Sequence, residues 1–481
     1  MMNFRPVLFV LGILVLLLGL VMLIPAAIDF LAGDPTWKAF ISSFLISIFV
    51  GGALILANRG EIGSLNLRQA FLLTSTSWLV LAALAALPLN FADLNLSYTD
   101  SFFEAMSGIT TTGSTVIVGL DSAPHGLLMW RALLQWLGGI GIIVVAVAIF
   151  PDLRVGGMQL FRSESSDTLE KALPRSAQIA LYIGLVYLVL TMICSLALYG
   201  AGMSLFESIA HAMTTIATGG FSTSDQSVGH FNSAVIDWII VVFMIIGSMP
   251  FVLYLEILRR RIGLFVKDSQ IRVFLGILAI SVTTVAVWQS FDNSTAADTI
   301  RSSAFNVISI ITGTGYSTAD YGLWGSFPVA AFLVFIFIGG CAGSTSCGIK
   351  IFRYQVIFET ARTHINNIWQ PHTISVPRYN GRSIPDSVMD AVMTFVFVFL
   401  LIFCLLTAAL TLMGLDFVTA ISGAGAAIAN VGPGLGQVIG PGGTYAPLPD
   451  AAKWVLSAGM LLGRLELFTI LVLFTPAFWR G

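Results

Sequence analysis

Four short segments of this chain share one pattern, and that pattern limits the folds open to it more than any other feature. Each reads Ile, then Ala or Thr, then two mostly small or polar residues, then Gly: Ile109–Gly113, Ile216–Gly220, Ile311–Gly315 and Ile428–Gly432. Their spacing of roughly 100 residues is too long for a solenoid unit but long enough for two membrane-crossing helices. Four such loops between hydrophobic segments predict a pore that they line together.

Composition indicates a membrane protein with many spans. The 481 residues are 57% hydrophobic and only 10% charged, whereas a soluble domain carries about 25% charged residues. We expect an all-α membrane fold, because ten apolar runs each approach the length that a bilayer requires. These runs are 6–28, 38–57, 69–89, 126–150, 178–201, 234–257, 271–290, 327–348, 388–413 and 452–476.

The repeats divide the chain into five predicted parts. Residues 1–65 form an N-terminal two-helix extension that precedes the first repeat. Four tandem pore repeats follow, each a helix, a re-entrant pore loop and a second helix around a central pore. Their predicted ranges are 66–160, 161–265, 266–385 and 386–481.

A short helix is predicted before each loop. At the same distance before each closing glycine stands a good N-cap residue: Ser97, Ser204, Thr299 and Asp416. Ser97 with Asp100 and Ser204 with Glu207 resemble capping boxes. About three apolar turns are too short to span a bilayer, so we expect re-entrant half-helices whose C-terminal dipoles favour a cation. The alternative is four ordinary helix–loop junctions with chance similarity.

The distribution of Lys and Arg predicts the orientation. One set of loops carries clusters such as Arg259, Arg260 and Arg261, and Arg5 and Arg480 at the termini fall on the same side. The opposite side shows only Lys38, Arg131, Arg301 and Lys453. Because cytoplasmic loops are enriched in basic residues, we expect both termini in the cytoplasm and the four loops open to the outside.

The four loops have the chemistry of a filter for a weakly hydrated monovalent cation. Glycine lets backbone carbonyls approach an axis closely, and carbonyl and threonine oxygens can replace the water around a bare ion. Divalent ions would normally require carboxylates, and no segment from Ile to Gly contains one. The candidate filter residues are Thr111, Thr112, Gly113, Thr218, Gly219, Gly220, Gly313, Thr314, Gly315, Asn430, Val431 and Gly432. Asp121, Asp225 and Asp320 are expected at the outer mouth.

These loops carry a family resemblance. Residues 109–115, 216–223, 314–318 and 429–436 are similar to the loops of the Trk/Ktr/HKT superfamily of potassium transporters, and the chain most resembles the bacterial TrkH type. The resemblance implies K⁺ uptake through a gated, channel-like pore in the inner membrane, with one filter glycine per loop: Gly113, Gly220, Gly315 and Gly432. Some plant relatives that transport Na⁺ have serine at the first position, so Gly113 implies K⁺.

One hydrophobic run is interrupted where the resemblance implies a gate. Residues 339–348 include Gly339, Gly340, Gly343, Ser344, Thr345, Ser346 and Gly348, which disfavour a regular helix. We expect an intramembrane loop that obstructs the ion path under the filter, as in the second helix of the family's third repeat. The alternative is a tight helix crossing, where small residues are also common in membranes.

Arg464 lies in the middle of the last predicted span. A charge at that depth costs at least ~2.5 kcal/mol and marks function by default. Below a cation filter it would raise the barrier for K⁺, and the resemblance implies an arginine that faces the intramembrane loop. The alternative is a structural ion pair with Glu466 or bonds to backbone carbonyls. On a regular helix Glu466 would point elsewhere.

Partners and rival functions complete the expectations. The resemblance implies a homodimer and a nucleotide-binding cytosolic TrkA-type subunit that docks on the polar 350–387 loop. The chain itself has no nucleotide motif, and we expect no nucleic-acid partner. We expect no cofactor and K⁺ as the only bound metal ion, held as substrate. The rivals are a Na⁺-conducting relative, a secondary transporter for a small solute and a membrane enzyme, for which the five histidines fall at interfaces or loops.

Overall fold

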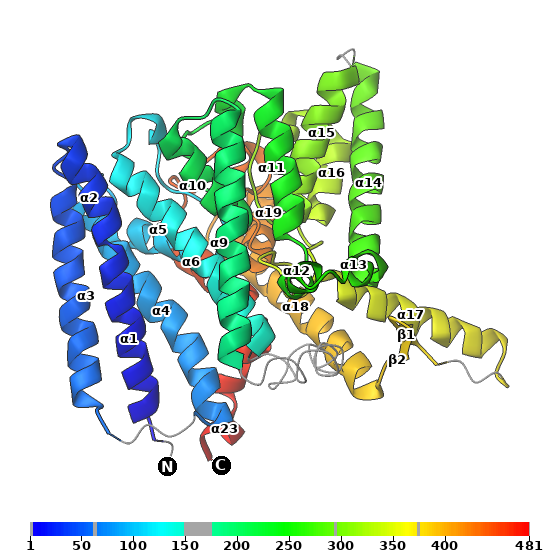
Figure 1. Ribbon diagram of the computed structural model, residues 1–481. Helices are drawn as coiled ribbons and strands as arrows, with labels where there is room; N and C mark the ends of the chain where they lie inside the picture. Colours follow the sequence, from blue (N-terminus) through cyan, green and yellow to red (C-terminus); the bar gives the residue numbers. More distant parts are fainter. Residues whose placement is uncertain (1–2, 61–64, 149–175, 293–295, 373–375, 481) are drawn as a thin grey trace.

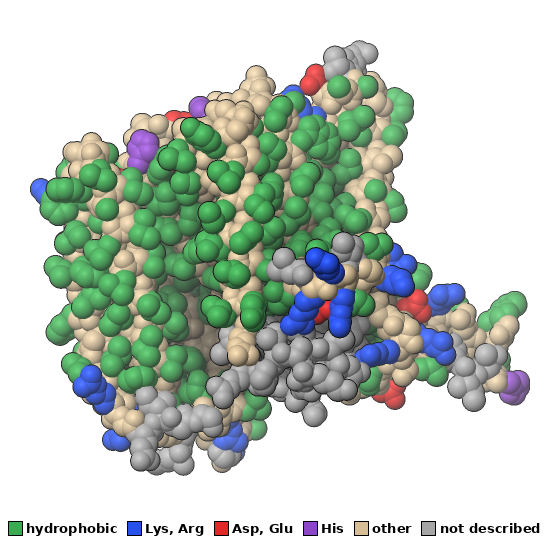
Figure 2. All heavy atoms as spheres, in the orientation of Figure 1, with side chains coloured by type: hydrophobic (Ala, Val, Ile, Leu, Met, Phe, Trp, Pro, Cys, Tyr) green, Lys and Arg blue, Asp and Glu red, His purple; other side chains and the backbone are tan. Residues whose placement is uncertain are grey.

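The computed structural model describes residues 3–60, 65–148, 176–292, 296–372 and 376–480. These residues form a helical membrane protein with one small hairpin, β1 (Arg378–Tyr379) and β2 (Arg382–Ser383). The two chain ends lie at the same end of the molecule (Figure 1). Most Lys and Arg side chains on the visible face lie in the lower half of the molecule, toward the end that carries both termini (Figure 2). Apolar side chains cover the flanks (Figure 2).

The N-terminal extension is a helical hairpin. Its first arm is α1 (Arg5–Val21) followed by α2 (Leu23–Ala32), and its second arm is α3 (Trp37–Ala57). Gly12 and Gly51 face each other where α1 and α3 cross, and a Cβ on either would collide with the other's carbonyl oxygen. Small residues therefore hold the two arms at a close crossing.

Four helix–half-helix–helix units follow, which confirms the predicted fold class. The first helices are α4 (Leu67–Phe91), α9 (Ser176–Gly200), α14 (Ser269–Gln289) and α18 (Asp386–Leu412). The half-helices are α5 (Tyr98–Ile109), α10 (Leu205–Ile216), α15 (Ala296–Ile311) and α19 (Phe417–Ala429). The second helices begin with α6 (His125–Ala148), α11 (Ala234–Gly247), α16 (Ser326–Phe335) and α21 (Asp450–Arg464).

Three of the four second helices are interrupted. The helix α11 meets α12 (Phe251–Leu258) at 96°, and α21 meets the helical segment beginning with α22 (Phe468–Leu471) at 104°. Within the described residues, seven helices are long and apolar enough to span a membrane, or up to nine if each bent pair is one span. The eighth predicted run, 327–348, is helical only over α16, and the polypeptide beyond it is irregular until α17 (Ile351–Trp369).

The predicted half-helix caps are confirmed at three positions and wrong at the fourth. Ser97 and Ser204 form complete capping boxes, and Asp416 accepts from the Thr419 amide. Thr299 instead lies within α15, which begins at Ala296. The remaining short helices are α13 (Ile262–Lys267), α20 (Gly436–Ile439) and α23 (Pro476–Arg480), with 3₁₀ turns at 120–122, 227–231, 290–292, 321–323 and 472–474.

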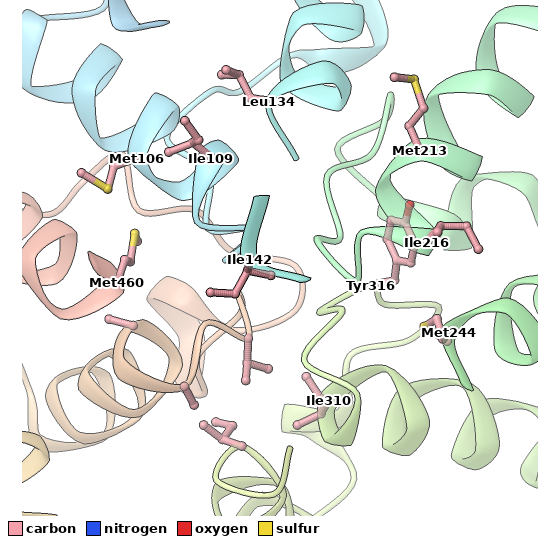
Figure 3. Close-up of a cluster of buried hydrophobic side chains, with 14 of the residues drawn as sticks. Met106, Ile109, Leu134, Ile142, Met213, Ile216, Met244, Ile310, Tyr316 and Met460 are labelled. Atoms are coloured by element: carbon pink, nitrogen blue, oxygen red, sulfur yellow. The ribbon is translucent and has the colours of Figure 1, made fainter. Parts of the chain in front are cut away.

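A buried apolar layer surrounds the ends of the half-helices. Met106 and Ile109 from α5 and Met460 from α21 lie on one side of it, and Met213 and Ile216 from α10 lie on the other (Figure 3). The isoleucine that opens each repeated segment is buried in all four repeats: Ile109, Ile216, Ile311 and Ile428. The shared isoleucine therefore anchors each half-helix in the core, directly before the chain turns into the loop.

The capping bond of the second half-helix offers a first test. Ser204→Ala removes the acceptor for the Glu207 amide and should destabilise the protein by about 1 kcal/mol. We expect a lower melting temperature in detergent. Ser233→Ala is the matched control, because Ser233 caps α11 without a side-chain hydrogen bond. Equal melting temperatures for the two variants would contradict this role of the cap.

Candidate functional site

Each half-helix ends in the same hydrogen-bonded turn. The amides of Thr112, Gly219, Thr314 and Val431 donate to the carbonyls of Ser107, Thr214, Ser309 and Ala426. The preceding residue is left-handed in every case: Thr111, Thr218, Gly313 and Asn430 have φ of 53°, 48°, 74° and 52°. This is the Schellman arrangement, which usually places Gly or Asn at that position. Gly313 is thus the ordinary residue for the turn, whereas the β-branched Thr111 and Thr218 are strained.

The closing glycines form a ring. A Cβ built on any of the four closing glycines would lie within 3.0 Å of a carbonyl oxygen of the next repeat. The glycine and carbonyl pairs are Gly113 with Gly219, Gly220 with Thr314, Gly315 with Val431 and Gly432 with Thr112. Each glycine therefore touches the carbonyl of the next repeat, and the fourth repeat closes on the first. The φ values of 88°, 79°, 82° and 99° add a second reason for glycine. Chance similarity among four junctions does not produce a closed ring.

A cavity of about 200 Å³ opens on this ring and is lined by all four closing glycines. Asp225 lines the cavity and accepts from the amides of Gly119 and Leu120, so it also ties the second loop to the first. The Ser224 hydroxyl lowers the pKa of the nearby Asp121 carboxyl, which keeps that group ionised. Asp320 accepts from the Gly322 amide as a local cap.

The predicted gate residues lie against the half-helix ends that lead into the second and third loops. Residues 339–348 form a loop, and the residues that flank it, Ile338 and Ile349, pair with each other in a β-bridge. Between them, Ser346 Oγ donates to the Thr312 carbonyl at 2.6 Å, and Thr345 Oγ1 donates to the Ile216 carbonyl at 3.0 Å. This segment thus reaches the half-helix ends directly.

Arg464 contacts the same segment. It is 1% exposed, and its Nη1 donates to the Thr345 carbonyl at 3.1 Å and lies 2.7 Å from Cys347 Sγ. Its Nη2 donates to the Gly138 carbonyl at 2.8 Å. The guanidinium therefore joins the 339–348 segment to α6, and backbone carbonyls are its partners, as one of the sequence alternatives held.

The expectation that a regular helix continues through Glu466 is wrong. The helix α21 ends at Arg464, and Glu466 and Leu467 adopt φ of 59° and 52°. The Glu466 carboxylate pairs with Arg353 in the protein interior rather than with Arg464. Arg353 also lies 3.6 Å from the centre of the Phe395 ring.

The sequence did not identify Lys350 and Arg353 as parts of this site. The enrichment of basic residues in cytoplasmic loops already explained the Lys and Arg residues of the 350–387 loop. Both side chains are buried, and Lys350 Nζ contacts the Ser346 carbonyl. A small cavity of about 10 Å³ is lined by Lys350, Arg464 and Glu466 with residues of the 339–348 segment. The detectable signal was a Lys and an Arg directly after a Gly/Ser-rich break in an apolar run.

His211 also departs from its predicted place at an interface or loop. It is fully buried within α10, where Nε2 lies 3.0 Å from Ser222 Oγ and Nδ1 lies 2.9 Å from the Glu207 carbonyl. The side chain ties the half-helix to the chain that follows the second loop, which is a structural role.

Comparison with known proteins agrees with this architecture. The TrkH family, described as cation transport proteins, matches residues 36–480. The chain is 42% identical to the Trk system potassium uptake protein TrkI of Halomonas elongata, over 99% of this chain and 97% of that protein. It is 40% identical to TrkH of Escherichia coli, over 100% of both chains. The crystal structure of the potassium transporter TrkH from Vibrio parahaemolyticus matches with a TM-score of 0.93 and 36% identity over 100% of both chains.

The chain belongs to the TrkH family. The resemblance drawn from the four loops is thereby confirmed over the full length of the sequence. TrkH-family proteins are membrane transporters, so the enzyme considered among the rivals is excluded. Because the agreement with the TrkH crystal structure extends over the whole chain, it includes the N-terminal helical hairpin as well as the four repeats.

The buried pair of Arg353 and Glu466 can be tested by removing one charge. Glu466→Gln leaves the Arg353 guanidinium buried without its carboxylate, which should cost about 3–5 kcal/mol. We expect a large drop in melting temperature and partial recovery when Arg353→Met is added. Glu359→Gln is the control, because its pair with the exposed Arg362 is only partly buried and contributes little. A Glu466→Gln protein as stable as the wild type would rule out this role.

Proposed function

We propose that this protein carries K⁺ into the cell through a K⁺-selective, gated, channel-like pore. The observation that carries the proposal is the closed ring in which each closing glycine meets the carbonyl of the next loop. Neutral oxygens from four loops suit a monovalent ion that sheds its water. The relatives named as potassium uptake proteins support K⁺ as the substrate.

The filter in this proposal consists of the twelve loop residues predicted from the sequence, with K⁺ held by backbone oxygens. The C-terminal ends of the half-helices point at the loops and add partial negative charge. Residues 339–348 and Arg464 form the gate, since they lie against the loop ends and join them to α6. An inward electrochemical gradient then drives the ion.

We further propose that the protein works in the cytoplasmic membrane as a homodimer with both termini in the cytoplasm. Basic side chains at the end that carries both termini support this orientation (Figure 2). A cytosolic nucleotide-binding subunit of the TrkA type would bind the 350–387 region and act on the gate. The start of α17 supports that route, because Lys350 contacts the 339–348 segment and Arg353 pairs with Glu466 in the break between α21 and α22.

Uptake of ⁸⁶Rb⁺ into proteoliposomes with an internal K⁺ load tests the function directly. We expect uptake that external K⁺ blocks and Na⁺ does not. Equal block by Na⁺ would favour a Na⁺-conducting member of the family. Absence of uptake by both the wild type and a variant with a shortened 339–348 segment would instead favour a different substrate. A pore opened by that change should conduct a permeant ion.

Gly432→Ser tests the ring. Its Cβ would lie 2.6 Å from the Thr112 carbonyl oxygen, at a φ of +99°. We expect the K⁺ over Na⁺ preference to fall by about tenfold, or ~1.4 kcal/mol of differential binding. Gly442→Ser is the control, because Gly442 lines the same cavity but has no neighbour within 4 Å of the new atom. Unchanged selectivity would exclude the fourth loop from the filter.

Shortening the 339–348 segment tests the gate. Deletion of residues 342–345 keeps the paired backbone at Ile338 and Ile349 but removes the Thr345 bonds to the second repeat. We expect a several-fold higher initial rate of ⁸⁶Rb⁺ uptake with the same K⁺ over Na⁺ preference. A rate equal to that of the wild type would remove the segment from the gate.

A further inference from the structure

Gln135 of α6 spans the closing glycine of the second loop. It is fully buried, its Nε2 donates to the Gly219 carbonyl at 2.6 Å, and its Oε1 accepts from the Phe221 amide at 3.0 Å. One side-chain amide thus holds the backbone on both sides of Gly220. Gln supplies a donor and an acceptor on the same planar group, and this position uses both.

The carbonyl that Gln135 holds belongs to the ring, because the Gly219 oxygen is the one that meets Gly113. The other three ring oxygens come from Thr112, Thr314 and Val431. Among the described residues, the Gly219 oxygen alone of the four accepts a side-chain hydrogen bond. The ring therefore departs from fourfold symmetry at the second loop, where one oxygen is fixed by an outside group.

Arg131 stands one turn before Gln135 on α6 and holds the next part of the same loop. It is 2% exposed, its Nη1 donates to the Ser222 carbonyl at 2.8 Å, and its guanidinium lies 4.0 Å from the centre of the Phe221 ring. Together the two side chains hold residues 219–222 against one face of α6.

The same arginine reaches the first loop through Glu104 of α5. Arg131 Nε donates to Glu104 Oε1 at 2.8 Å, and Glu104 Oε2 accepts from the Val116 amide at 2.8 Å. Thr115 Oγ1 donates to Glu104 at 3.0 Å and lies 3.3 Å from Arg131 Nη2. A buried ion pair needs such added bonds to offset its desolvation, and here they come from the chain directly after Gly113.

We propose that Gln135 and the Glu104–Arg131 pair are positioning residues that set the ion selectivity of the pore, by fixing the second loop against the first. The inference rests on the proposed K⁺ transport. A rigid scaffold matters here because the Gly113–Gly219 contact is the point at which the first two repeats meet in the ring. Arg131 also lines the cavity above the ring, and Glu104 neutralises its charge there.

Gln135→Glu is the sharpest variant, because it keeps shape and the acceptor for the Phe221 amide. Its second oxygen replaces the donor that faces the Gly219 carbonyl, so that carbonyl is repelled rather than held. We expect ⁸⁶Rb⁺ uptake to persist while the K⁺ over Na⁺ preference falls by about tenfold. Gln289→Glu is the matched control, because Gln289 Oε1 accepts from Ser302 and Ser303 and its amide nitrogen has no acceptor among the described residues. Its selectivity should not change.

Glu104→Gln tests the charge. The uncompensated Arg131 guanidinium at the outer cavity should raise the KM for K⁺ by several-fold at low ionic strength, and added salt should reduce the effect. Adding Arg131→Met should restore the KM. A merely structural role would lower the yield of folded protein and the maximal rate without a salt-dependent KM, and that result would overturn the role of the pair.

The outcomes separate this inference from the function on which it rests. Wild-type uptake without preference for K⁺ over Na⁺ would overturn the proposed function. A selective wild type with an equally selective Gln135→Glu variant would overturn the positioning role alone. If Gln135→Glu does not fold, Thr115→Val removes the hydroxyl that bonds to Glu104, Arg131 and the Ile117 amide. Its preference should then fall by about twofold, and an unchanged preference would overturn the inference.

Discussion

The contact between each closing glycine and the carbonyl of the next loop is the constraint on which the rest of the structure depends. No side chain fits between them, so the four loops approach one another as closely as backbones can. Each half-helix ends in the same Schellman turn, which leads into the residue whose carbonyl meets the neighbouring glycine. A buried isoleucine fixes each half-helix in the core, and side-chain caps add to this in α5, α10 and α19. The spanning helices supply the wall around them.

Charge is distributed very differently on the two sides of this ring. At the cavity above the ring, Arg131 pairs with Glu104 and donates to the Ser222 carbonyl, and Glu104 also accepts from the Val116 amide. Around the 339–348 segment, Lys350, Arg353 and Arg464 share the interior with Glu466. Because buried charge interacts strongly at low dielectric, we expect the side of the 339–348 segment to resist a cation more than the other side does. This asymmetry is consistent with a barrier on the inner side of the proposed filter.

Much of the fold and of the candidate site could be predicted from local signals. Capping boxes at Ser97 and Ser204 predicted their half-helices correctly because a cap acts within four residues. The cap predicted at Thr299 was wrong because α15 is longer than the other half-helices and begins at Ala296. The bends after Gly247 and Arg464 escaped detection because the average hydropathy stays high across each bent pair, and hydropathy measures transfer into lipid rather than backbone direction.

The sequence by itself determined the family, the four repeats and the glycines at their loops, because those features are local and periodic. Only the tertiary structure decided which carbonyl meets which glycine, that Glu466 pairs with Arg353 rather than Arg464, and that Gln135 holds the second loop. Such partners lie far apart in the chain, and a residue's type gives its bonding capacity but not the neighbour that satisfies it. The packing of the repeats around the ring makes that choice.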